Sequence, residues 1–266
     1  YNLYQDKEPL EINKQTNYAS YIAVAVWHFY LLNNDLNFLQ YFWEPVKKGI
    51  LFSLSLQHIN GAIAWNIDDS EKIDEDYLLT GCSSIAKSLE CAIAISKVLE
   101  YKSFESEWRD AHSKLIMALE NPAEIFDLKK ERSRFSMDWY YPILGGINSQ
   151  QRITSLIQNI KDSFWIKGLG IKCVADEPWV TVAETCECSI AYKKIGEDKI
   201  ASELLLNAIA IVDKEDIPYM GWQFHENIYW PEETPSWTSA ACILAADANN
   251  QLTSGANLFL EQQFKA

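Results

Sequence analysis

Carboxylate and aromatic side chains occur close together at three places in the sequence. These places are residues 138–141 (DWYY), 179–184 (WVTVAE) and 232–237 (EETPSW). Two carboxyl groups in one cleft suit general acid–base catalysis, in which one group donates a proton and the other accepts one. Aromatic faces pack well against the C–H groups of sugars. The combination is typical of a cleft in which a glycosidic bond is hydrolysed.

Nine residues are the candidates for such a cleft. We expect three carboxylates to act as catalytic acid or base: Asp138, Glu184 and Glu233. We expect six further side chains to bind substrate: Trp65, Tyr140, Tyr141, Trp179, His225 and Trp237.

Each of these candidates also has a simpler interpretation. Asp138 precedes a predicted helix and fits the role of an N-cap. Glu184 and Glu187 interrupt an otherwise neutral helix, where buried carboxylates are costly unless they are paired or functional. The tryptophans fit ordinary core positions, and a single histidine on a loop, such as His225, is commonly a surface residue.

The elements that carry these residues are predicted to be almost entirely helical. Helices buried on all sides alternate with amphipathic ones, and the buried helices start near Tyr18, Gly81, Trp139, Thr181 and Trp237. The helices are expected at 18–32, 35–56, 78–98, 104–119, 138–147, 151–160, 179–192, 198–212, 236–248 and 252–264. No segment shows convincing alternation of apolar and polar residues, so strands should be few.

This alternation predicts helical hairpins arranged side by side in an all-α fold, an α/α toroid, as a single domain over 1–266. Five hairpins can be counted, so the ring either closes with five or needs more chain upstream. The starts of the inner helices would surround one mouth of the toroid, where their N-terminal dipoles favour anionic or polyhydroxyl ligands.

Composition narrows the class of partner. The chain has 266 residues, a net charge of −14 and 10 Trp, 13 Tyr and 11 Phe residues. An acidic surface repels phosphate backbones, so we expect no nucleic-acid partner, and no long apolar run indicates a membrane partner. The expected partner is a small-molecule or oligosaccharide substrate. The sequence does not indicate an oligomeric state.

The cysteines and short motifs indicate neither a metal nor a cofactor. The six cysteines lack zinc-type spacing, and Cys186 and Cys188 would point in different directions on a helix. The acids between Asp68 and Asp76 fit a solvated loop. No phosphate-binding glycine loop and no nucleophile elbow occur. Reduced cysteines predict a cytoplasmic protein.

Four stretches of the chain carry a family resemblance. Residues 78–85 (LLTGCSSI), 137–142 (MDWYYP), 178–185 (PWVTVAET) and 237–247 (WTSAACILAAD) resemble a group of bacterial proteins described as prenyltransferase-like. The wider resemblance is to two superfamilies of α/α toroids. One contains the six-hairpin glycosidases, typified by glucoamylases, and the other contains the terpenoid cyclases and protein prenyltransferases.

The resemblance to glucoamylases implies an inverting acid–base pair. Residues 236–240 (SWTSA) resemble the opening of the last inner helix of those enzymes, which places Glu232 or Glu233 nearest the base, although the usual Glu-Gln dipeptide is absent. Residues 74–77 (DEDY) lack the last Asp of the cyclase motif. Of the zinc ligands of prenyltransferases, only a cysteine and a histidine have counterparts in this chain, Cys188 and His225.

The sequence therefore predicts a carbohydrate-active, glycoside hydrolase-like enzyme with a carboxylate acid/base pair at one mouth of the toroid. Two alternatives stay open at this point. One is a prenyltransferase-like or terpenoid cyclase-like toroid that handles an isoprenoid, and the other is a non-catalytic binding or scaffold toroid.

Overall fold

The computed structural model describes residues 4–5, 8–9 and 13–265. The predicted single domain over 1–266 and the polar segment at its start therefore include residues that the structure does not describe. The described chain is mainly helical and divides into two compact units. The first comprises the described residues up to 131 together with 145–147 and 262–265, and the second comprises 132–144 and 148–261. None of the described helices combines the length and the apolar character needed to cross a bilayer.

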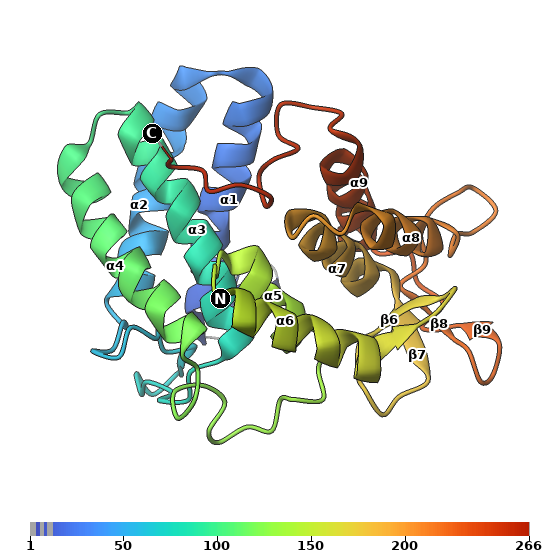
Figure 1. Cartoon of the computed structure of the whole chain (residues 1–266). Helices are drawn as coiled ribbons and strands as arrows, with labels where there is room; N and C mark the ends of the chain where they lie inside the picture. The colour runs from blue at the N-terminus through green and yellow to red at the C-terminus, as the bar shows by residue number, and fades with distance from the viewer. Residues whose placement is uncertain (1–3, 6–7, 10–12, 266) are drawn as a thin grey trace. The chain divides into compact units, whose positions relative to one another are not determined.

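The first unit consists of two helical hairpins and short strands. Its elements are β1 (Tyr4–Gln5), β2 (Glu8–Pro9), β3 (Lys14–Gln15), α1 (Thr16–Asn33), α2 (Leu36–Leu54), β4 (Asn66–Ile67), α3 (Leu79–Val98) and α4 (Lys102–Glu120). Helix α1 packs against α2 and α3, and α3 packs against α4 (Figure 1). The side chain of Asp35 accepts a hydrogen bond from the backbone N–H of Phe38, which confirms its predicted N-cap role.

Helix α3 buries more of its side chains than the neighbouring helix α4. Nearly every side chain of α3 is buried, whereas α4 buries one face that includes Trp108 and Leu115. The contrast confirms the predicted alternation of buried and amphipathic helices. The prediction is wrong for α1, because Tyr18 and Phe29 are exposed. Helix α1 has packing partners on only part of its circumference.

The second unit combines helices with a sheet. Its elements are α5 (Met137–Gly145, whose last residue belongs to the first unit), α6 (Gln150–Asn159), the π-helix η1 (Ile160–Phe164), β5 (Trp165–Ile166), β6 (Gly170–Lys172), β7 (Trp179–Thr181), α7 (Val182–Lys194), α8 (Asp198–Ile209), β8 (Gly221–Gln223), β9 (Ile228–Tyr229) and α9 (Ser236–Asn250). Helix α7 packs against both α8 and α9.

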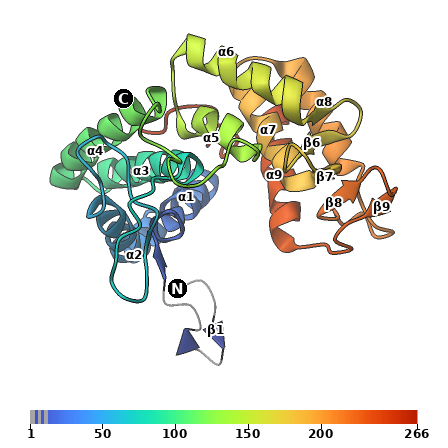
Figure 2. The same cartoon turned by 90° about the horizontal axis from the view of Figure 1, so that it is seen from below.

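The five strands β5 to β9 form one antiparallel sheet in sequence order (Figures 1 and 2). The register pairs Trp179 with Gln223 and Trp222 with Tyr229. The expectation of few strands is therefore wrong for this unit. Strands of two or three residues are too short to show alternation in a sequence. Residues 179–181, predicted as the first turn of a helix, form β7 because they pair with β8.

The predicted final helix over 252–264 does not form. Helix α9 ends at Asn250, and the next residue, Gln251, adopts the left-handed conformation, with φ of 54°. The Asp247 carboxylate then accepts hydrogen bonds from the backbone N–H of Thr253 at 2.8 Å and from its hydroxyl at 2.6 Å. These bonds fold the chain into turns, so the fifth predicted hairpin retains only its first helix.

Candidate active site

The candidate site lies in the second unit, where α5 and α7 carry its polar residues. On α7, Glu184 and Glu187 are three residues apart and therefore share one face. On α5, Tyr140 and Tyr141 follow Asp138. Hydrogen bonds between these side chains join the two helices.

Glu187 is the centre of this group. Its Oε2 accepts a hydrogen bond from the Tyr140 hydroxyl at 2.8 Å, and its Oε1 accepts one from the Tyr141 hydroxyl at 3.1 Å. Burial, together with the nearby charge of Glu184, raises the pKa of Glu187 to about 7, although the two tyrosine bonds lower it. Burial and the same two carboxylates raise the pKa of Tyr140 well above its usual value. Glu187 therefore titrates near neutral pH while both of its oxygens are held in place.

Glu184 has a different hydrogen-bond partner from Glu187. Its carboxylate is hydrogen-bonded to the thiol of Cys173, whose pKa is raised chiefly by burial and then by the Glu184 charge. Among the described residues, no cationic side chain lies within ion-pair distance of Glu184. Glu184 lies in the first turn of α7, where the helix dipole favours a negative charge.

The sheet fixes the start of α7. The Thr185 hydroxyl donates a hydrogen bond to the carbonyl of Thr181 at 2.6 Å and accepts one from the backbone N–H of Ile171 in β6 at 2.9 Å. Gly170 has a φ of +140°, and a Cβ at this position would approach the Thr185 hydroxyl to 2.6 Å. Only glycine fits there, so β6 lies directly against the turn that carries Glu184.

Asp138 and Glu233 have different surroundings. Asp138 is buried in the first turn of α5, inside the helix rather than before it, and its Oδ2 lies 3.3 Å from Nε of Arg132. The simple N-cap interpretation is therefore wrong. Glu233 is exposed on the loop before α9, where its carbonyl accepts a hydrogen bond from the backbone N–H of Met220.

The predicted binding residues are only partly brought together. Trp65 belongs to the first unit, where Lys130 Nζ lies 5.6 Å from its ring centroid. Tyr140 is fully buried. His225 is exposed and lies edge-on to Phe224. Trp179 and Trp237 belong to the second unit, and Trp237 is exposed at the start of α9.

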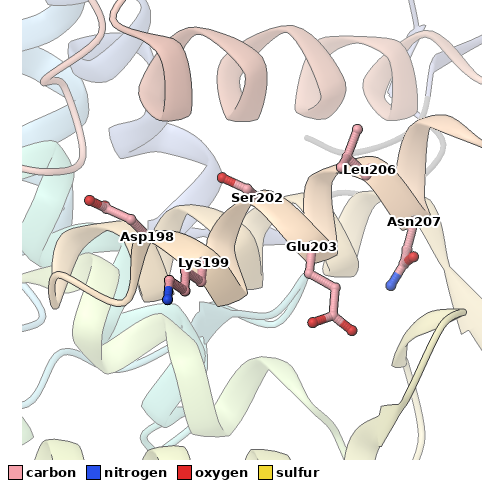
Figure 3. Close-up of a pocket in the computed structure, with 6 residues that line it drawn as sticks. All are labelled: Asp198, Lys199, Ser202, Glu203, Leu206 and Asn207. Atoms are coloured by element: carbon pink, nitrogen blue, oxygen red, sulfur yellow. The ribbon is translucent and has the colours of Figure 1, made fainter.

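A separate hollow on α8 contains none of these candidates. Figure 3 shows its six lining residues, which all come from this one helix: Asp198, Lys199, Ser202, Glu203, Leu206 and Asn207. The candidate acid–base residues on α5 and α7 therefore do not line this hollow. Glu187 was not among the nine residues expected to form the site, although its spacing of three residues from Glu184 is a signal in the sequence.

The raised pKa of Glu187 predicts how stability depends on pH. The folded protein binds a proton at Glu187 up to about pH 7, whereas the unfolded chain releases it near 4.5. This contribution to stability is complete below about pH 4.5 and is lost as the pH rises through about 7. We expect Glu187→Gln to flatten the dependence of the melting temperature on pH over this range. An unchanged dependence would contradict the assignment.

The chain was compared with known protein families and with solved structures. No family model matches the chain. Among solved structures, it resembles a cellobiose 2-epimerase from Bacillus thermoamylovorans (TM-score 0.69, 11% identity, 96% of this chain and 76% of the other). It also resembles a GH63 mannosylglycerate hydrolase from Thermus thermophilus (TM-score 0.61, 10% identity, 92% and 77%).

These likenesses show the fold. The chain has an α/α-toroid fold, which confirms the predicted class. Both of these structural neighbours are sugar enzymes, so they give no support to the isoprenoid alternative. A further match, to a rhamnosidase from Klebsiella oxytoca, has a TM-score of 0.61 and 11% identity over 86% of this chain, which spans only 46% of that enzyme.

Sequence similarity is higher with one curated enzyme. The chain is 36% identical over 249 residues to an MMP endo-(1,4)-3-O-methyl-alpha-D-mannosidase of Mycolicibacterium hassiacum. The match covers 94% of this chain and 68% of that enzyme. The chain is a carbohydrate-active, glycosidase-like enzyme, and it belongs to the family of this endo-mannosidase.

Proposed function

We propose that this chain is an endo-acting glycoside hydrolase that cleaves 1,4-linked 3-O-methyl-α-D-mannosyl chains. The observation that carries the proposal is the identity of 36% to the endo-mannosidase over nearly the whole chain. Glu184 in the first turn of α7 supplies one carboxyl group of the kind that this reaction needs. We also expect the enzyme in the cytoplasm, since Cys82 and Cys91 are buried free thiols. Fractionation of the native cell checks this location.

Glu184 is the group that we assign to proton transfer. Both oxygens of Glu187 accept tyrosine hydrogen bonds, so Glu187 is held as a positioning residue. Glu184, which the tyrosines do not hold, is the member of the pair that can exchange a proton with substrate.

The second carboxyl group of the reaction is assigned to Asp138 or Glu233. In an inverting hydrolysis, one group protonates the glycosidic oxygen as its bond to the anomeric carbon breaks. The other removes a proton from the water that attacks from the opposite face. Asp138 is charge-paired with Arg132, whereas Glu233 is exposed on its loop. Tyr140 and Tyr141 act through Glu187, and Trp179 and Trp237 supply aromatic surface for the sugar.

A direct assay tests the proposal. The full chain is incubated with a 1,4-linked 3-O-methyl-α-D-mannosyl oligosaccharide, and the products are followed by mass spectrometry and by proton NMR of the anomeric positions. We expect cleavage at internal linkages and first release of the β-anomer, the outcome of inversion. The unmethylated 1,4-linked mannosyl oligosaccharide is the matched substrate control. Absence of cleavage of the methylated chain would contradict the proposal.

A further inference from the structure

Large apolar side chains are exposed in β9, in the loop that follows it and at the start of α9. Trp230 is 51% exposed and Trp237 is 59% exposed, and Ile228 and Tyr229 are exposed nearby. A cluster of exposed apolar residues on a folded protein commonly marks a binding surface. Tyr229 already stacks on Tyr219, with ring centroids 4.0 Å apart. Trp230 is therefore the aromatic side chain of β9 and its adjoining loop with the larger accessible surface.

Trp230 is held in place by its neighbours. Its backbone N–H donates a hydrogen bond to the carbonyl of Gly221 at 3.1 Å, and its carbonyl accepts one from Nε1 of Trp179 at 2.6 Å. The rings of Trp179 and Trp230 lie edge to face, with centroids 5.2 Å apart and planes at 82°. An aromatic side chain that is fixed before binding loses little conformational entropy when a ligand stacks on it.

Gly221 gives Trp179 the room for this arrangement. A Cβ at position 221 would lie 2.6 Å from Nε1 of Trp179 and 2.4 Å from the carbonyl oxygen of Val180. Either approach is too close for a side chain. The indole of Trp179 therefore lies directly over β8, in the position from which it bonds to Trp230.

The aromatic pair lies near the proposed catalytic turn. Strand β7 runs from Trp179 to Thr181, and α7 begins at the next residue and carries Glu184 in its first turn. At about 3.3 Å per strand residue, Trp179 is roughly 10 Å from the start of α7. The backbone N–H of Val182 donates a hydrogen bond to the carbonyl of Met220, which ties this start to the segment before β8.

The charge around the pair selects a kind of ligand. Glu232 and Glu233 are exposed on the same loop, and the segment 228–237 contains no basic residue. An acidic rim disfavours phosphates and acidic sugars, whereas carboxylates accept hydrogen bonds from hydroxyl groups. The indole faces favour C–H and methyl groups. A neutral sugar that carries an O-methyl group has both features.

We propose that Trp230, supported by Trp179, forms a subsite that binds one 3-O-methyl-α-D-mannosyl residue of the substrate through its C–H and methyl face. This inference rests on the proposed function and adds to it a residue that distinguishes methylated from unmethylated chains. A methyl group buried against the indole gains affinity that a hydroxyl group in the same place does not gain.

Binding to a non-hydrolysing enzyme tests the subsite. In the Glu184→Gln background, isothermal titration calorimetry measures the affinity for a 1,4-linked 3-O-methyl-α-D-mannosyl tetrasaccharide and for its unmethylated counterpart. We expect Trp230→Ala to weaken binding of the methylated chain about tenfold, which corresponds to about 1.4 kcal/mol. Binding of the unmethylated chain should weaken about threefold or less. Trp230→Phe should retain most of the affinity.

Two controls separate the possible outcomes. Tyr41→Ala removes an exposed aromatic residue of α2 in the first unit and should leave both affinities unchanged. If the parent protein cleaves the methylated chain but Trp230→Ala binds it as tightly as the background protein, the subsite is overturned and the function stands. If Trp230→Ala loses the same affinity for the methylated and the unmethylated oligosaccharide, recognition of the methyl group is overturned. If the parent protein neither binds nor cleaves the methylated chain, the proposed function fails and the subsite fails with it.

Discussion

Replacing Glu184 by glutamine is expected to lower kcat by about 10²- to 10⁴-fold, the usual contribution of one general acid or base. Glutamine has nearly the shape of glutamate but cannot exchange a proton with the glycosidic oxygen or with water. Binding of substrate should change little, so KM should stay within a few-fold of the parent value. Steady-state kinetics on the methylated oligosaccharide measure both constants, and circular dichroism checks that the fold is intact.

A matched control shows whether the effect on kcat depends on the position of the removed charge. Glu215→Gln removes the same charge from an exposed loop of the same unit and should leave kcat unchanged. Asp138→Asn and Glu233→Gln, made in the same series, show which of the two supplies the second carboxyl group. A kcat for Glu184→Gln within threefold of the parent value would remove Glu184 from the reaction.

Replacing Glu90 by glutamine is expected to cost about 3–5 kcal/mol of stability, the usual result of breaking a buried ion pair. Nζ of Lys87 lies 2.6 Å from Oε1 of Glu90 on α3, and the two side chains are only 3% and 2% exposed. The same oxygen accepts a hydrogen bond from the backbone N–H of Gln263 at 2.8 Å. Burial in this unit lowers the pKa of His112 to about 4, as expected where charged forms are poorly solvated.

Thermal unfolding measures this loss. At about 2–4 °C per kcal/mol for a chain of this size, the melting temperature should fall by roughly 6–20 °C. Adding Lys87→Met to Glu90→Gln removes the buried lysine charge as well, keeps an acceptor for Gln263, and should recover at least half of the loss. Glu44→Gln breaks the exposed pair with Lys47 and should cost under about 1 kcal/mol. A loss for Glu90→Gln no larger than that for Glu44→Gln would contradict the prediction.

Local patterns in the sequence were sufficient for most of the helices. The sequence predicts a helix at 78–98, and α3 is observed at Leu79–Val98, because small and apolar residues on all faces specify a buried helix whatever its neighbours are. The capping aspartate before α2 is a local signal of the same kind. The carboxylates and aromatic residues at the helix starts likewise indicated sugar chemistry before any contact was known.

The tertiary structure decided the features that depend on distant residues. Residues 179–181 form a strand because they pair with residues 221–223, and residues after Gln251 form turns because Asp247 binds Thr253. The interaction of Glu187 with Tyr140 and Tyr141 joins residues 46 and 47 positions apart. Hydrophobic periodicity reports which face of a helix is buried but not which side chains meet across it. The sequence alone therefore determined the class of fold and the kind of chemistry, and only packing decided which of the two carboxylates on α7 the tyrosines hold.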